Sequence, residues 1–72
     1  MSHDQVNNNV REIRKLQSLT QNQLAKLVGV SRVSIVAIEG GRFLPTIETA
    51  LRIGRALNTS LETLFQLRGE NK

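Results

Sequence analysis

The sequence contains no cysteine, a single histidine at position 3 and a single aspartate at position 4. Without cysteine the chain can form neither a disulfide framework nor a cysteine zinc site, which fits a reducing cytoplasm. His3 has no second metal ligand near it in the sequence, and the glutamates are scattered without partners at the spacing of acid/base catalysis. We therefore expect no metal, no cofactor and no enzymatic activity.

Long hydrophobic runs and aromatic residues are scarce as well. No apolar run approaches the roughly 18 to 20 residues that span a membrane, and the N-terminal residues MSHDQVNNN lack the apolar stretch of a signal peptide. We therefore expect a cytoplasmic protein without a membrane partner. Only two residues are aromatic, Phe43 and Phe65, which argues against a stacking surface for single-stranded nucleic acid.

The length and charge of the chain indicate one small basic domain. The chain has 72 residues, 39% of them hydrophobic, and a domain of this size buries only about 60% of the surface of its unfolded chain. Ten Lys and Arg against six Asp and Glu give a formal net charge of +4. This balance favours a polyanionic partner, but charge alone leaves the partner open.

The stretch from Thr20 to Arg42 has the pattern of two short helices joined by a tight turn. Thr20 and Gln23 have the spacing of a capping box, which starts the first helix. Gly29 suits the left-handed backbone that ends this helix. The expected buried stripe between these ends consists of Leu24, Leu27 and Val28.

The second helix of this stretch is expected to have one buried face and one outward face. Ser31 caps it, Ile35 and Ile38 lie three residues apart on the buried face, and Gly40 and Gly41 end it. At 100° per residue Val33 lies almost opposite the buried pair. Such an arrangement places a recognition helix in the DNA major groove.

Residues 10 to 65 resemble the small bacterial helix-turn-helix regulators of the phage Cro and repressor type, the XRE family. The motifs that carry the resemblance are LTQxxLAxxxGVSRxxIxxIExG, a proline before a Thr-capped helix, and ALxxSLxxLF. The resemblance implies an all-α fold, a compact five-helix bundle of the lambda-repressor type. We expect a flexible N-terminal tail at 1–6, a domain at 7–67 with the helix-turn-helix at 20–39, and a C-terminal tail at 68–72.

The first helix is expected to run from Val6 or Asn7 to Ser18. Its apolar stripe would consist of Val6, Val10, Ile13 and Leu16, closed by Leu19. Ser18 stands where the family usually has glycine, so we expect this helix end to be less tightly defined.

Two further helices are expected towards the C-terminus. Thr46 caps the first, whose apolar stripe would be Ile47, Ala50, Leu51, Gly54 and Leu57, with another backbone close to Gly54. Asn58 ends it, and Ser60 caps the second helix over 61–67. Two interpretations of the last helix stay open, closure of the core or contact with a second copy, and the residues concerned are Leu61, Leu64, Phe65 and Leu67.

The resemblance also assigns roles to single residues. It implies an ion pair between Arg14 and Glu39 that joins the first helix to the recognition helix. Base edges would be contacted by Arg32, Val33, Ser34 and Ala37. Phosphates would be bound by Gln21, Ser31, Arg42 and, through a backbone amide, Gly41.

Two functions compete at this point. The first is a sequence-specific regulator, a repressor in type, that binds double-stranded DNA as a homodimer on a palindromic operator in a bacterial or archaeal nucleoid. The second is a helix-turn-helix that contacts protein, such as an antitoxin or adaptor. It is favoured by Val33, Val36 and Ala37, which make the outward face of the recognition helix unusually apolar, although small apolar side chains also contact thymine methyl groups.

Overall fold

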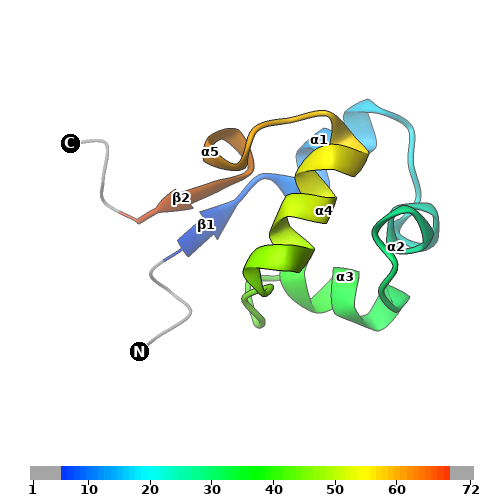
Figure 1. Ribbon diagram of the computed structural model, residues 1–72, viewed down its shortest axis with the longest axis horizontal. Helices are drawn as coiled ribbons and strands as arrows, with labels where there is room; N and C mark the ends of the chain where they lie inside the picture. Colours follow the sequence, from blue (N-terminus) through cyan, green and yellow to red (C-terminus); the bar gives the residue numbers. More distant parts are fainter. Residues whose placement is uncertain (1–5, 69–72) are drawn as a thin grey trace.

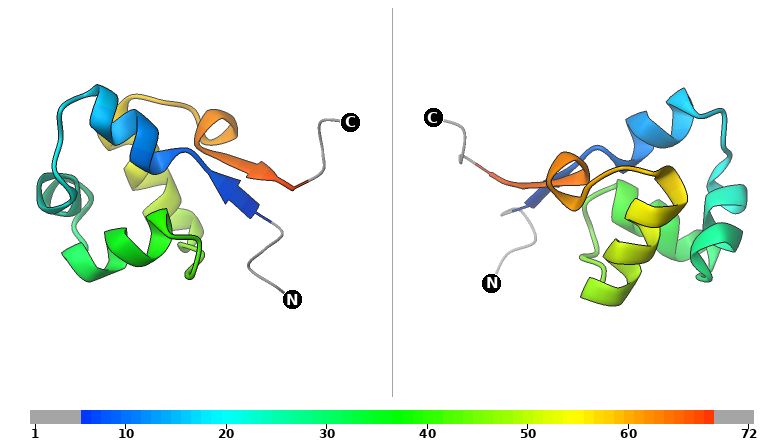
Figure 2. Two further views of the ribbon diagram at one scale, coloured as in Figure 1. Left: turned by 180° about the vertical axis from the view of Figure 1, so that it is seen from behind. Right: turned by 45° about the horizontal axis from the view of Figure 1, so that its top comes forward.

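A computed structural model describes residues 6–68 and places a small two-stranded sheet at one end of a helical globule (Figures 1 and 2). The expected all-α, five-helix architecture is confirmed, and the sheet is a minor addition. The parts of the two expected tails at 1–5 and 69–72, with His3 and Asp4, lie outside the described residues. The elements in order are β1 (Val6–Asn8), α1 (Val10–Leu16), α2 (Gln21–Val28), α3 (Arg32–Glu39), α4 (Ile47–Leu57), α5 (Leu61–Leu64) and β2 (Phe65–Leu67).

Hydroxyl side chains define the starts of four helices, as the sequence predicts. The Thr20 hydroxyl accepts a hydrogen bond from the Gln23 amide at 3.0 Å, and the Gln23 side chain accepts one from the Thr20 amide at 2.8 Å. Both halves of the capping box are therefore formed. The same side-chain bond to the third helical amide caps α3, α4 and α5, at Ser31, Thr46 and Ser60.

The ends of α2 and α4 also follow the prediction. Gly29 and Asn58 both adopt the left-handed conformation there, with φ of 87° and 53°. Within α4, a Cβ atom on Gly54 would lie 2.9 Å from the carbonyl oxygen of Thr59. This confirms the prediction that another backbone approaches Gly54 closely, which explains why a glycine lies inside this helix.

The first helix begins later than predicted. Residues Val6 to Asn8 form β1 instead, and the Asn8 side-chain oxygen accepts the Val10 amide at 3.1 Å, which turns the chain from strand into helix. Val6 therefore belongs neither to a helical stripe nor to a tail. The predicted position of Leu16 is also wrong, because 83% of this residue is exposed.

The helix predicted over 61–67 breaks after Leu64. Phe65 has the extended conformation, with φ of −131° and ψ of 128°, and the chain continues as β2. Strands β1 and β2 are antiparallel, with Val6 opposite Leu67, Asn7 opposite Gln66 and Asn8 opposite Phe65. The Asn9 amide prolongs this ladder by donating to the Leu64 carbonyl at 2.8 Å. The two ends of the described chain are thus joined to each other.

The core lies between the helices, where α2 packs on both α3 and α4. Besides Leu16, three residues predicted in the buried stripes are exposed, with exposed fractions of 61% for Leu27, 78% for Ile47 and 55% for Leu51. The apolar arc of α4 is wider than the part of it that is buried, so the sequence did not show which of its apolar residues would be covered, and Ile53 was missed. The buried hydrophobic residues are Val10, Leu24, Ala25, Val28, Ile35, Ile38, Ile53, Leu57 and Leu64.

Ser18 follows α1 in a conformation that glycine adopts more easily, with φ of 59°. The end of α1 is nevertheless defined by two backbone bonds, from Ser18 to the Lys15 carbonyl at 2.9 Å and from Leu19 to the Arg14 carbonyl at 3.1 Å. The backbone strain therefore comes from the Ser18 side chain, because a Cβ atom in the left-handed region costs about 1 to 2 kcal/mol.

Replacing Ser18 with glycine is expected to raise the free energy of unfolding by about 0.5 to 1 kcal/mol. The relief of strain exceeds the extra chain entropy that glycine has in the unfolded state. For a domain of this size, thermal melting should rise by roughly 2 to 8 °C. Asn58→Gly is the matched control. Its free energy of unfolding should rise less than that of Ser18→Gly, because asparagine tolerates the left-handed region. A melting temperature of Ser18→Gly at or below that of the wild type would contradict the prediction.

Candidate nucleic-acid interface

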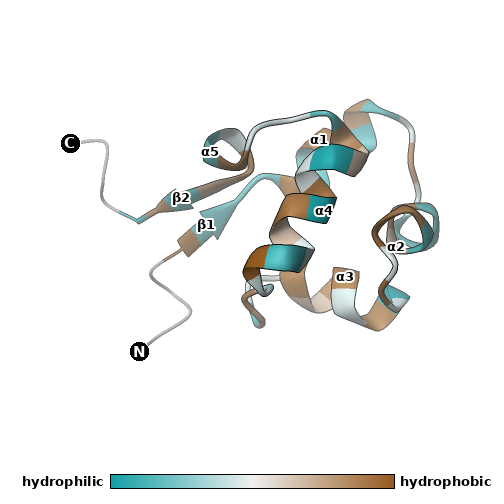
Figure 3. Cartoon of the chain, in the orientation of Figure 1, coloured by the Kyte–Doolittle hydropathy of each residue, from teal (hydrophilic) through white to brown (hydrophobic). Residues whose placement is uncertain are grey.

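Helix α3 has one face in the core and one face exposed. Ile35 and Ile38 are buried, whereas Val33 is 73% exposed on the opposite side. Figure 3 shows the largely hydrophobic colouring of this helix. Because α3 packs on α2 across the turn at Gly29, its N-terminal end is presented away from the core, as docking into a major groove requires.

The four candidates for base contact all lie on α3 and differ in exposure. Arg32 and Val33 are exposed, and Arg32 forms no ion pair within residues 6–68. Ser34 and Ala37 are partly buried. The Ser34 hydroxyl lies 3.1 Å from the Ser31 hydroxyl, so a contact from Ser34 to a base would have to share or replace this hydrogen bond. The longest exposed donor on this face is therefore Arg32.

The C-terminal end of α3 is joined to α1 by the ion pair between Arg14 and Glu39. Arg14 Nε donates to Glu39 Oε2 at 2.6 Å, and Arg14 Nη2 donates to Glu39 Oε1 at 3.2 Å. The two side chains are only 8% and 3% exposed. A bidentate arginine–carboxylate pair of this kind fixes both distance and orientation between the two helices.

Further hydrogen bonds hold the same helix end. Arg14 Nη1 donates to the Leu19 carbonyl at 2.7 Å, and the Gln21 side-chain amide donates to Glu39 Oε1 at 3.2 Å. From the sheet, Asn8 Nδ2 donates to the Ile38 carbonyl at 3.0 Å. Sequence reasoning missed Asn8, since nothing in a run of asparagines indicates a partner 30 residues away. Strand β1, α1 and α2 thus all fix the orientation of α3.

The phosphate-binding candidates have fewer available groups than predicted. The Gly41 amide donates to the Ile38 carbonyl at 3.1 Å, so the predicted phosphate contact through this amide would have to share or replace that hydrogen bond. The Ser31 hydroxyl caps α3, and the Gln21 side chain is bound to Glu39. Arg42 follows the turn at Gly41 and has an exposed side chain. It remains the best-placed candidate for a phosphate.

Of the four residues predicted to contact a second copy, one lies in the core and the others reach the surface. Leu64 is fully buried, so the monomer uses its side chain for its own core and the dimer prediction at this residue is wrong. Leu61 and Phe65 are partly buried, and Leu67 is 57% exposed. Leu61 and Phe65 line an apolar groove of about 360 Å³, which also includes Val6, Leu44, Pro45, Ile47, Ala50 and Glu62.

Ile47, like Leu51, is a residue of this surface that sequence reasoning wrongly placed in the core. The sequence does contain a signal for this surface. Ile47 and Leu51 are four residues apart, so their side chains lie on the same side of a helix. The exposed hydrophobic residues of this apolar face are Leu44, Ile47 and Leu51, which line this groove or the adjoining one, and Leu67, which pairs with the groove residue Val6.

Comparison with known proteins agrees with this geometry. A family model described as helix-turn-helix matches residues 10–64. The chain belongs to the XRE family of helix-turn-helix regulators. An uncharacterized HTH-type transcriptional regulator of Methanothermobacter thermautotrophicus is 48% identical over 59 residues, which are 81% of this chain and 86% of the relative. The control protein C.SmaI of Serratia marcescens is 36% identical over 61 residues, 85% and 73% of the two chains.

Two solved structures have the same fold. The P22 c2 repressor in complex with a synthetic operator matches with a TM-score of 0.75 and 36% identity, over 85% of this chain and 89% of the repressor. The restriction-modification controller protein C.AhdI of Aeromonas hydrophila matches with a TM-score of 0.72 and 28% identity, over 75% and 82%.

The family and the geometry together define the class of function. This XRE member is a transcriptional regulator with a helix-turn-helix DNA-binding fold, related to repressors and controller proteins. Its family consists of DNA-binding regulators and not of enzymes. None of the helices described in residues 6–68 is long and apolar enough to cross a membrane.

Proposed function

We propose that this regulator binds a palindromic operator in double-stranded DNA as a homodimer, inserts α3 into the major groove of each half-site, and represses transcription. The observation that carries the proposal is the exposure of Arg32 and Val33 at the N-terminal end of α3, a helix held in a fixed orientation by the Arg14–Glu39 pair. The fold of an operator-bound repressor, the P22 c2 protein, supports the same docking.

Within this proposal the exposed residues divide between sequence recognition and positioning. Arg32 and Val33 contact base edges at the N-terminal end of α3, with Ser34 and Ala37 behind them. Arg42, beyond the other end of α3, binds a phosphate and sets the position of the helix along the groove. Ser31 and Gln21 contribute through the helix starts at which they lie, where backbone amides attract anions.

The apolar face supports a second copy as its partner. Ile47, Leu51 and Leu67 are each more than half exposed, and a groove lies beside Ile47. Contiguous apolar surface of this kind marks interaction sites in monomers. To bind a palindrome, a two-fold dimer built on this face must hold its two α3 helices about 34 Å apart, one turn of B-DNA, each in one half-site.

Replacing Ile47 with glutamate is expected to convert a dimer at tens of micromolar into a monomer. The carboxylate would be desolvated in the interface, while the fold should tolerate the change because Ile47 is 78% exposed in the monomer. Sedimentation of the two proteins measures the difference. Leu16→Glu is the matched control: Leu16 is 83% exposed on α1, outside the apolar face, so this variant should remain dimeric. A monomeric wild type would refute the interface and leave any dimer dependent on DNA.

The alternative function is contact with protein through Val33, Val36 and Ala37. Selection of bound duplexes from a random pool distinguishes the two functions, since DNA recognition must enrich one two-fold sequence. Salt dependence gives the second criterion. Affinity for DNA should fall linearly with salt in a log–log plot as counterions are released, whereas an apolar protein contact hardly responds. A pool without enrichment would reject the proposed function.

A further inference from the structure

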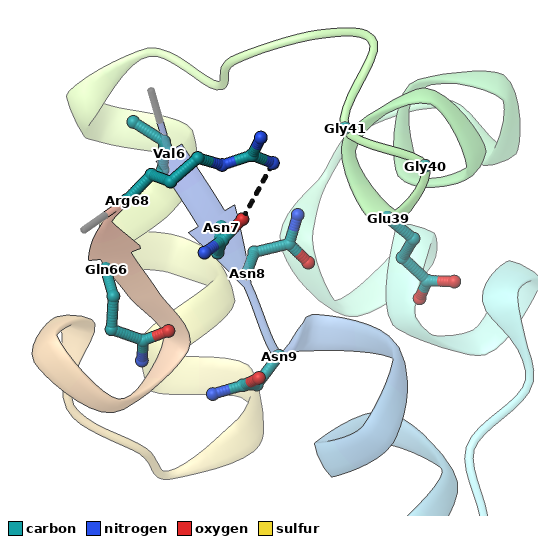
Figure 4. A pocket seen from close by; sticks show the side chains of 9 residues that line it. All are labelled: Val6, Asn7, Asn8, Asn9, Glu39, Gly40, Gly41, Gln66 and Arg68. Atoms are coloured by element: carbon teal, nitrogen blue, oxygen red, sulfur yellow. Dashed lines mark hydrogen bonds between the residues drawn. The ribbon is translucent and has the colours of Figure 1, made fainter. Parts of the chain in front are cut away.

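A polar groove of about 520 Å³ lies between strand β1 and the C-terminal end of α3 (Figure 4). One wall is the segment Glu39 to Gly41, which connects the recognition helix to Arg42. The other wall is the sheet, which neither the family motifs nor the sequence pattern indicated. The residues that line the groove are Val6, Asn7, Asn8, Asn9, Glu39, Gly40, Gly41, Gln66 and Arg68.

Arg68 is held over this groove from the far side of the sheet. It directly follows β2, and its side chain extends across β1, where Nη2 donates to Asn7 Oδ1 at 3.1 Å (Figure 4). An arginine has five N–H donors, so one hydrogen bond to Asn7 leaves the guanidinium able to bind an anion. Asn7 therefore orients the side chain without neutralising it.

The charge balance of the groove is positive. The two charged residues among those that line it are Arg68 and Glu39. Glu39 is paired with Arg14 through two hydrogen bonds, and its side chain is 3% exposed. The charge of Arg68 has no carboxylate partner within residues 6–68. The chemistry that fits is an anion with several acceptor oxygens, for which a guanidinium has matching geometry.

We propose that Arg68, oriented by Asn7, binds a phosphate of the DNA backbone next to the phosphate bound at Arg42. This inference rests on the proposed DNA-binding function. The groove borders the segment that leads from α3 to Arg42, and a helix in the major groove has a phosphate backbone on each side of it. The same wall is bound to β1 through the Asn8 contact with Ile38. A phosphate here would therefore bind the sheet and the recognition helix together.

The test is Arg68→Gln, titrated against a random-sequence duplex and the selected operator at several salt concentrations. Loss of one phosphate contact lowers the salt slope by about 0.9 for each subunit, and at 0.1 M salt this is a loss of affinity of roughly eightfold for each subunit. Operator and random duplex should lose affinity by the same factor, because a phosphate contact carries no sequence information. Arg68→Lys keeps the charge and should recover most of the slope.

Arg55→Gln is the matched control. Arg55 lies in the last turn of α4, at the end of that helix away from α3 in Figure 1, and the variant should leave the slope unchanged. If Arg68→Gln has an unchanged salt slope, the inference is overturned. The proposed function would still stand as long as the wild type prefers its operator to random duplex. Binding of inorganic phosphate at Arg68 with an unchanged DNA slope would also overturn it and indicate a free-anion site. If the wild type shows no preference for the operator over random duplex, the proposed function itself is rejected.

Discussion

Arg14→Ala is expected to lower the free energy of unfolding by about 3 to 5 kcal/mol, because it leaves the Glu39 carboxylate buried without its counter-charge. That carboxylate is 3% exposed and would keep only the Gln21 amide at 3.2 Å among its described partners. Small domains have total stabilities of roughly 5 to 15 kcal/mol, so much of the population would unfold near physiological temperature. Thermal melting should fall by more than about 12 °C.

Arg52→Ala is the control for this experiment. Arg52 forms an ion pair with Glu48 at the same distance, 2.6 Å, but the two side chains are 56% and 72% exposed. Such exposed pairs contribute about 0 to 1 kcal/mol. A melt of Arg14→Ala within a degree or two of the wild type would show that burial adds nothing to the Arg14–Glu39 pair. The double variant Arg14→Leu, Glu39→Leu should recover stability, since replacing both charges leaves none unpaired.

The same ion pair connects stability with function. Glu39 is the last residue of α3, and Arg14 and Gln21 join it to α1 and to the start of α2. Base contacts tolerate little displacement, because a bidentate hydrogen bond requires its donors at fixed positions. The double leucine variant should therefore bind its operator more weakly than its recovered stability suggests.

Local signals explain what the sequence predicted well. A helix cap depends on residues within one turn, so Thr20 with Gln23, and Ser31, Thr46 and Ser60, could be assigned without knowledge of the tertiary structure. The left-handed helix ends at Gly29 and Asn58 are equally local. Buried residues depend on what packs against a helix, and Ile47 and Leu51 were misplaced because the apolar arc of α4 is wider than the part of it that the core covers.

The sheet had no signal of this kind. Strand β1 contains Asn7 and Asn8, and asparagine has a low strand propensity. Three residues are too few to show alternation, and the partner strand begins 57 residues further on, at Phe65. The polar groove and the position of Arg68 depend on that pairing, so they could only be found in the structure. The resemblance to the family, by contrast, was sufficient to place Arg14 and Glu39 together.

Arg32→Ala is expected to weaken operator binding by about 1 to 3 kcal/mol for each half-site while affecting random duplex less. Arg32 is exposed at the N-terminal end of α3, where a guanidinium can donate two hydrogen bonds to guanine O6 and N7. Preference at one base pair of each half-site should relax. Titration of the variant against operator and scrambled duplex at several salt concentrations measures both effects.

Arg42→Ala is the counterpart on the other side of the helix. Arg42 lies beyond Gly41, where a phosphate is the nearer target, so operator and scrambled duplex should weaken alike and the salt slope should fall by about 1 for each subunit. An equal loss of both affinities in Arg32→Ala would make Arg32 a phosphate contact too. Sequence would then have to be recognised by the apolar face of Val33, Val36 and Ala37 against thymine methyl groups, or through the deformability of the operator.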